Sequence, residues 1–596
     1  MPGDVSVRAH SVAFSLLFAS ACASRPPPPK PPPPPPQATA APVATPAPAK
    51  ERDDDAIDAA AKKYVDLLVE VFPERGTELG RHERDSVLDD RTLVGEDRAI
   101  GRLEAMLAEL DEQLAEPKAS PAQLTDLAMI RGALRVEIRT RRAQRPLQRQ
   151  PDFYVSGPLG AIFLMTAREY APEAERARNV LSRLEQIPKT LEAAKANLLN
   201  PPKVWTEVGI DSAASAKGFL AAQKPFLEKA LPTERARTNR ALSQAVAAFD
   251  DYEAYLRKVL LKRSNGNFAA GKELFAYRLA NAYFVEEDAD ALLALGKKIY
   301  ERTQAEMTEV AKRIDPAAKG WPEVVAKLKD DHPSASGLLD VYKKEVARAR
   351  AFLVEKDVVE MPPGDDLTVM ETPPFMRSTL GSAAYDRPPP FDAGTKGFFF
   401  VTPVDGSLPK PRQEEMLREH DHGDIVDTTV HEAYPGHHLQ LSFGRRHPSL
   451  VRKALHPAIF SEGWALYSEE LMAELGYYTD KERLMQLEWT LVRAARVILD
   501  VGLHTGTTTF EQAVKMLTDE VHLERTLATS EARRYTMTPT QPLSYLVGRE
   551  RLFALREAVK KRDGDKFSLR RFHTDVLSRG SVPPSLLARE MLGAAR

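Results

Sequence analysis

Histidines gather in one short stretch of this sequence. Five of the thirteen histidines lie between positions 420 and 438, and residues 431–438 read His-Glu-Ala-Tyr-Pro-Gly-His-His. A His-Glu pair that a further histidine follows is how helical zinc hydrolases arrange two metal ligands, with the glutamate as general base. We therefore expect one zinc ion here, with His431 as a ligand and Glu432 as the residue that takes a proton from water.

The second histidine is not at the usual spacing of four residues. On a regular helix, a separation of six turns the side chain by about 240°, and a separation of seven places it about 10.5 Å along the axis. Neither suits one ion with bonds of about 2.1 Å. Pro435 and Gly436 can interrupt the helix and bring one of the two histidines back to the ion, and we choose His437 because a glycine directly precedes it. His438 is the alternative, and otherwise is expected just outside the ligand shell.

An acidic, aromatic segment supplies a third candidate ligand. Glu462 lies 25 residues after His437, and Glu469 follows seven residues later, so the two glutamates share one helix face two turns apart. We expect Glu462 to bind the metal and Glu469 to hydrogen-bond a ligand histidine, as metal-bound imidazoles usually require. Each piece alone also fits a structural role, but together and in this order they indicate a zinc site with one position left for water.

Beyond these glutamates, four polar residues follow one another at spacings of three or four, namely Arg493, Arg496, Asp500 and His504. This spacing places them on one face of a helix. For the arginines we favour ordinary salt bridges on a helix face. His504 stands at the predicted end of this helix and is better placed to reach a pocket. We expect His504 to help stabilise the oxyanion of the reaction.

Residues 531–548 carry the remaining candidate groups. Arg534 could clamp a substrate carboxylate through its bidentate guanidinium, and Tyr535 and Gln541 are predicted to line the same pocket. Tyr535 or Tyr545 could donate a hydrogen bond to the oxyanion, and we favour Tyr545 because Gly548 three residues later permits a close backbone approach. Both tyrosines would equally suit ordinary packing with a satisfied hydroxyl.

Helical periodicity dominates the chain from residue 51 onward and predicts an all-α protein. Apolar residues recur at threes and fours in segments rich in good helix formers, at 56–71, 99–114, 174–199, 241–261 and 289–314. Proline- and glycine-containing joints separate such segments. We expect one helical body over residues 51–596, with an N-terminal half at about 51–350 and a catalytic C-terminal half at about 365–596.

One strand candidate precedes the histidines. Residues 397–402 read Gly-Phe-Phe-Phe-Val-Thr, and Pro403 ends the run. The proline-rich residues 385–392 before it are expected to be irregular. We predict a single small β-hairpin near the active site.

The first fifty residues are typical of an exported, membrane-anchored protein. Residues 1–22 combine a polar start, an apolar run too short to span a bilayer, and small residues before Cys22. This pattern resembles a bacterial lipobox and predicts lipid attachment at Cys22, with a plain secretory peptide as the alternative. The proline-rich residues 23–50 should form a disordered, extended spacer. We therefore expect a cell-envelope lipoprotein, on the periplasmic side or at the outer membrane.

Composition excludes other classes of protein. The 596 residues carry 83 Lys+Arg and 85 Asp+Glu, and the formal net charge of −2 argues against a nucleic-acid partner. The single cysteine excludes an intrachain disulfide and a cysteine-rich metal site.

The chain also resembles the bacterial domain of unknown function 885 family, in residues 72–80, 431–440, 462–470, 572–573 and 582–583. The resemblance covers most of the chain after the proline-rich segment. That family is similar to helical gluzincin zinc peptidases such as thimet oligopeptidase and angiotensin-converting enzyme. The resemblance implies a large helical body with a deep cleft, a tyrosine from a C-terminal helix at the oxyanion, and a strand at 397–402 that pairs with an extended peptide.

These features together predict a zinc metallopeptidase that hydrolyses short peptides, as a dipeptidase, carboxypeptidase or oligopeptidase. The zinc would polarise the scissile carbonyl, and Glu432 would pass the water proton to the leaving amine. There are two alternatives. One is a zinc amidohydrolase acting on non-peptide or cell-wall amides, and the other is a non-catalytic surface lipoprotein that binds peptides.

Overall fold

The computed structural model describes residues 52–373, 377 and 382–593. The predicted signal segment 1–22, with Cys22, and the proline-rich segment 23–50 lie outside these ranges. From Arg52 onward the chain forms one compact unit. None of the helices in the described ranges has both the length and the apolar character that crossing a bilayer requires.

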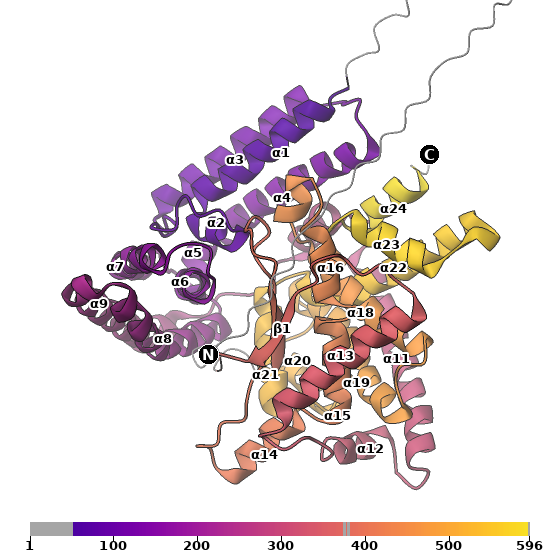
Figure 1. Ribbon diagram of the computed structural model, residues 1–596. Helices are drawn as coiled ribbons and strands as arrows, with labels where there is room; N and C mark the ends of the chain where they lie inside the picture. Colours follow the sequence, from indigo (N-terminus) through magenta and orange to yellow (C-terminus); the bar gives the residue numbers. More distant parts are fainter. Residues whose placement is uncertain (1–51, 374–376, 378–381, 594–596) are drawn as a thin grey trace, which may run out of the picture. The chain divides into compact units, whose positions relative to one another are not determined.

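Helices make up most of the described chain, as the periodicity predicts, and the five predicted segments correspond to α1, α3, α7, α9 and α11 (Figure 1). The N-terminal helices are α1 (Asp54–Val71), α2 (Pro73–Leu79), α3 (Leu93–Gln113), α4 (Pro121–Gln144), α5 (Pro146–Arg149), η1 (Pro151–Tyr154), α6 (Ser156–Ala167), α7 (Glu173–Asn197), α8 (Lys203–Ala230), η2 (Pro232–Glu234), α9 (Arg235–Tyr255), η3 (Leu256–Leu260), η4 (Leu261–Arg263), α10 (Lys272–Arg278), η5 (Leu279–Tyr283), α11 (Ala289–Ile314), α12 (Trp321–Leu328) and α13 (Leu338–Lys356).

The C-terminal part begins with three strands, β1 (Leu367–Glu371), β2 (Ala383–Asp386) and β3 (Gly397–Val401). The helices that follow are α14 (Lys410–Arg418), α15 (His422–Glu432), α16 (His437–Gly444), α17 (Leu450–Ala454), α18 (Ala458–Glu474), α19 (Asp480–Thr505), α20 (Phe510–Asp519), α21 (Arg525–Met537), α22 (Gln541–Asp563), η7 (Gly564–Lys566), α23 (Leu569–Ser578) and α24 (Pro584–Leu592).

The predicted β-hairpin is instead a three-stranded sheet with the order β1-β3-β2. β3 pairs in parallel with β1 and antiparallel with β2, with Val369 and Tyr385 on either side of Phe399. Part of the segment predicted to be irregular therefore forms an edge strand. Because β3 is paired along both edges, it cannot also pair with a peptide, and that expectation from the family resemblance is wrong. The outer edge of β2 is the candidate surface for such pairing.

Three apolar clusters form the core of the described residues. One joins α1, α3 and α4 to α13, α15, α18 and the last helices. A second joins α11 and α12 to α19–α22, and a third lies among α6–α9. Because the first two clusters combine N-terminal with C-terminal helices, the helices that carry the candidate site are held by packing from both parts of the sequence.

Two glycines allow α18 and α22 to cross in backbone contact (Figure 1). A Cβ atom on Gly548 would lie 2.0 Å from the carbonyl oxygen of Ile459, and one on Gly463 would lie 2.6 Å from the Gly548 Cα. Any side chain at either position would force the helices apart, because real Cβ atoms do not approach so closely. Glu462 adjoins this crossing on α18, and Tyr545 lies about one turn before it on α22.

Candidate metal centre

The chain leaves its helix directly after the His-Glu pair, as Pro435 and Gly436 predict. α15 ends at Glu432 and α16 begins at His437. Gly436 folds back against the end of α15, where its N–H donates to the Val430 carbonyl at 3.0 Å. A Cβ atom on Gly436 would lie 1.8 Å from the carbonyl oxygen of His431, so this turn requires glycine. The Trp464 indole donates to the Pro435 carbonyl at 2.8 Å and fixes the turn to α18.

This turn brings His431, His437 and Glu462 together. Each offers one ligand atom, and the three atoms lie within 4.8 Å of one another. The Glu462 carboxylate lies 3.7 Å from Nε2 of His431 and 3.3 Å from Nε2 of His437. Ligand atoms around a tetrahedral zinc with bonds of about 2.1 Å are about 3.4 Å apart, and two imidazoles with a carboxylate are a donor set that zinc accepts. The three residues therefore fit a zinc ion.

His438 is turned away from this cluster. Its Nε2 lies 2.6 Å from Asp365, and its Nδ1 lies 3.1 Å from the hydroxyl of Tyr385. Asp365 also accepts a hydrogen bond from Tyr434 at 2.7 Å. Both ring nitrogens of His438 are thus engaged, and its role is to tie the turn to Asp365 and to β2. The sequence offered no sign of Asp365, which follows a Pro-Pro-Gly joint far from the histidines.

Glu469 supports the first ligand histidine. Its carboxylate is fully buried and lies 2.7 Å from Nδ1 of His431. This contact fixes Nδ1 as the protonated nitrogen and leaves Nε2 for a metal. Burial alone would lower the pKa of His431, but Glu462 and Glu469 raise it to about 10. Burial would raise the pKa of Glu462, but His437 and His431 hold it well below the usual range. Without a metal, the cluster is therefore held by ionic hydrogen bonds.

Glu432 lies beside the edge strand. One of its carboxylate oxygens accepts a hydrogen bond from the backbone N–H of Tyr385 at 3.1 Å. This N–H belongs to the outer edge of β2, since β3 occupies the other edge. Glu432 is only partly buried, so its second oxygen can reach water or substrate. The candidate general base thus adjoins the strand edge along which an extended peptide could lie.

Tyr545 faces the candidate ligands from α22. Its ring stacks on that of His431 with centroids 6.4 Å apart. Burial and the charge of Glu462 raise the pKa of Tyr545, so its hydroxyl stays protonated and can donate a hydrogen bond. The amide of Gln541 lies 3.5 Å from this hydroxyl and accepts from Arg534 at 2.7 Å. Gln541 therefore connects Arg534 to Tyr545.

The guanidinium of Arg534 is already occupied. It donates to both carboxylate oxygens of Glu531, at 3.2 and 3.0 Å. Tyr535 is fully buried, and its hydroxyl donates to Glu531 at 2.6 Å while accepting from Arg496 at 3.1 Å. Arg496 also pairs with Glu531 at 2.7 Å, which agrees with the salt-bridge interpretation of the arginine stripe. Tyr535 does not line an open pocket, so the expectation that it binds substrate is wrong.

The expected role of His504 at the oxyanion is wrong. His504 is fully buried, and its Nε2 donates to the carbonyl of Tyr535 at 2.9 Å. Its Nδ1 accepts from the N–H of Ala270 at 3.3 Å. Burial lowers the pKa of His504 to about 4, so the ring is neutral and has no N–H left for a substrate. Its spacing from the arginines reflected a shared helix, not a shared pocket.

Comparisons with known proteins place the site in a family context. A profile of bacterial proteins of unknown function, DUF885, matches residues 73–591. A comparison with curated proteins found no match. The fold is similar to a provisionally assigned lipoprotein of unknown function from Shewanella oneidensis, with a TM-score of 0.76 and 26% identity over 90% of this chain and 99% of that chain. The fold is also similar to a provisionally assigned lipoprotein from Colwellia psychrerythraea, with a TM-score of 0.75 and 20% identity over 90% of this chain and 98% of that chain.

Proposed function

Since the chain belongs to the DUF885 family of bacterial proteins of unknown function, its activity must be inferred from the site, and we propose that it is a zinc metallopeptidase acting on short peptides. The observation that carries the proposal is the convergence of His431, His437 and Glu462 next to Glu432. The same order of ligands suggests a distant relationship to the helical gluzincin peptidases, which is part of the proposal.

Each residue has a role that follows from its position. His431, His437 and Glu462 would hold zinc, which when bound would supply Lewis acidity toward water and the scissile carbonyl. Glu432 would take a proton from the attacking water and deliver it to the leaving amine. The Tyr545 hydroxyl would donate to the oxyanion that develops on the carbonyl.

Two further observations support a peptide as the substrate. The outer edge of β2 adjoins Glu432, and strand edges bind extended peptides through backbone hydrogen bonds. Gly463 and Gly548 hold α18, which carries Glu462, in contact with α22, which carries Tyr545. The metal ligand and the oxyanion donor that would act on one carbonyl are therefore kept at a fixed separation.

We also propose export and lipid anchoring at Cys22. The first of the two similar structures is provisionally assigned as a lipoprotein, and this chain has its only cysteine directly after a signal-like segment. Labelling with a radioactive fatty acid in the native host tests the assignment. A Cys22→Ala variant should lose the label, whereas an unlabelled wild-type chain would exclude anchoring.

Metal content and peptide hydrolysis test the main proposal together. The wild-type protein should bind one zinc ion per chain and cleave members of a mixed library of short peptides. His431→Ala should lose both properties. Glu432→Gln should keep zinc but lose turnover by about 10²- to 10⁴-fold.

Other outcomes would redirect or refute the proposal. Full activity in Glu432→Gln would exclude this glutamate as general base. Failure to bind zinc after careful reconstitution would refute the metal site. Zinc binding with cleavage only of non-peptide or cell-wall amides would make the protein an amidohydrolase, and zinc binding without any cleavage would leave a binding protein.

A further inference from the structure

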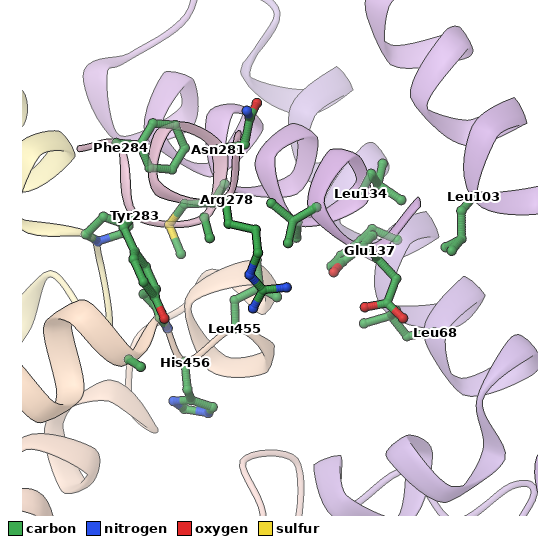
Figure 2. Close-up of a pocket in the computed structure, with 18 of the residues that line it drawn as sticks. Leu68, Leu103, Leu134, Glu137, Arg278, Asn281, Tyr283, Phe284, Leu455 and His456 are labelled. Carbon is green, nitrogen blue, oxygen red and sulfur yellow. The ribbon is translucent and has the colours of Figure 1, made fainter. Parts of the chain in front are cut away.

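A cavity of about 330 Å³ lies beside the start of α18, the helix that carries Glu462 (Figure 2). It is lined by residues from α1, α4, the α10–η5 segment and the turn before α18. Ala458, at the start of α18, lines the cavity and lies about one turn before Glu462. Tyr283 lines it as well. Burial raises the pKa of Tyr283 to about 12, and the charge of Glu462 acts in the same direction as a smaller cause.

A second, smaller cavity of about 70 Å³ shares one lining residue with the first. His456 lines both cavities, while Tyr385 and Arg387 line the smaller one. Tyr385 is the residue whose backbone N–H contacts Glu432. The smaller cavity therefore adjoins the residue that contacts the candidate general base, and the larger one lies between α4 and the start of α18.

Three cationic or hydrogen-donating side chains in these cavities have no protein partner. Among the described residues, neither Arg75 nor the Arg387 guanidinium makes a hydrogen bond or an ion pair within 4.0 Å. Both ring nitrogens of His456 are buried without a hydrogen-bond partner. By contrast, Arg278 in the same cavity donates to the Pro539 carbonyl and to Thr140.

Leaving the buried ring nitrogens of His456 unpaired is costly, whereas Arg75 and Arg387 are partly exposed and their guanidinium groups remain available to a carboxylate. Burial lowers the pKa of Arg387 to about 10; the charge of Glu78 opposes this shift, and the charge of Arg75 acts in the same direction as burial. Two acids are close. Glu137 is already held by Arg141 at 2.6 Å, and Glu78 is hydrogen-bonded to neither arginine, while burial raises its pKa. The cavity is therefore prepared for an additional anion.

The position of the arginines relates this anion to the reaction. Arg387 is two residues beyond Tyr385, and an extended chain advances about 3.3 Å per residue. A peptide lying along β2 would thus place a group about 7 Å from the general base, one or two residues from the scissile bond, next to Arg387. Guanidinium forks match carboxylates in shape and charge.

We propose that Arg75, Arg387 and His456 bind a carboxylate of the substrate, so that the enzyme prefers peptides with a carboxylate one or two residues from the scissile bond. This inference rests on the proposed peptidase function. The carboxylate can be the C-terminus of a short peptide or an acidic side chain. Arg534 already binds both carboxylate oxygens of Glu531, so this proposal places the carboxylate clamp at Arg75 and Arg387 instead.

The test measures binding separately from turnover. Calorimetry with the zinc-loaded Glu432→Gln protein would compare trialanine with trialanine amide, and would compare tripeptide amides that end in Glu or in Gln. Carboxylate ligands should bind about 10- to 100-fold more tightly than their uncharged partners. Arg75→Gln and Arg387→Gln should each remove most of this preference. Arg240→Gln, which changes an exposed arginine on α9, should keep it.

The outcomes separate this inference from the proposed function. A preference for trialanine over its amide identifies the C-terminal carboxylate, and a preference for Glu over Gln identifies a side chain. Equal affinities in both pairs, or a preference that survives both arginine variants, would overturn the inference even if the wild-type enzyme cleaves peptides. A preference without any cleavage would support the carboxylate site and refute the peptidase. If an arginine variant does not fold, equal affinities in the Glu432→Gln protein would still overturn the inference, and the other arginine variant would test the assignment.

Discussion

Replacing Glu469 by glutamine should weaken zinc binding while leaving the ligand set intact. The carboxylate is fully buried and lies 2.7 Å from Nδ1 of His431. Glutamine has almost the same shape and can still accept from Nδ1 through its carbonyl oxygen. What it removes is the negative charge that makes the imidazole a stronger ligand.

The size of the effect follows from this contact. A hydrogen bond to a charged group contributes about 1.5–3 kcal/mol, and a neutral one about 0.5–1.5 kcal/mol. The difference of about 1–1.5 kcal/mol corresponds to about a tenfold increase in the zinc Kd. Glu469→Ala also removes the acceptor and should raise the Kd by about 100-fold, at the upper end for residues that orient metal ligands.

Competition with a fluorescent zinc chelator would measure the Kd of each variant. Glu470→Gln is the matched control, because its carboxylate lies on the same helix and is bound by Arg483 at 3.0 and 3.1 Å. This control should keep the wild-type Kd within about twofold. Unchanged affinity in both Glu469 variants would refute the assignment of His431 as a ligand that Glu469 orients.

Three more predictions address the turn, the oxyanion and pH. Gly436→Ala should abolish zinc binding and lower the Tm, because its Cβ would lie 1.8 Å from the His431 carbonyl; metal analysis and calorimetry check this. Tyr545→Phe should keep zinc but lower kcat by about 10²- to 10³-fold, and an unchanged kcat would exclude Tyr545 from the oxyanion. Burial opposes protonation of His82, but Asp392 and Asp85 raise its pKa to about 9. Protonated His82 therefore stabilises the folded state by about 1–2 kcal/mol. This contribution is fully present below the pKa of His82 in the unfolded chain, about 6.5, and is lost as pH rises through 9. The Tm of His82→Gln should accordingly lie below that of the wild type at low pH, and the difference should shrink over that range.

Local sequence was sufficient to predict the elements of the site but not every contact within it. The helix period identified α1, α3, α7, α9 and α11, and the order of His431, Glu432 and Glu462 identified the residues that converge. The choice between His437 and His438 depended on how the chain turns at Gly436. This turn is determined by a backbone contact with α15 that no spacing rule describes.

The errors arose where a pattern along one helix was used to predict a contact between helices. His504 shares a stripe with Arg496, but its ring nitrogens meet backbone groups of two distant segments. Arg75 and Arg387 were not predicted at all, because they come from the start and the middle of the chain and meet only in the folded protein. A short strand such as β2 was hidden by the prolines that follow it.

The glycine contact between α18 and α22 has a mechanical consequence. With no side chains between the two backbones, the helices cannot slide or tilt without collision, so Glu462 and Tyr545 must move as one rigid body. Any opening that admits a peptide therefore has to come from the opposite wall, formed by β2 and the loop to β3. Apart from its pairing with β3, that wall is attached mainly by side-chain hydrogen bonds, from Arg168 to Asp386 and the Arg387 carbonyl, from Arg445 to the Pro389 and Asp392 carbonyls, and from His82 to Asp392. Amide hydrogen exchange should accordingly be fast at 383–396 and slow at 459–467, and the reverse order would place the moving part in the helices.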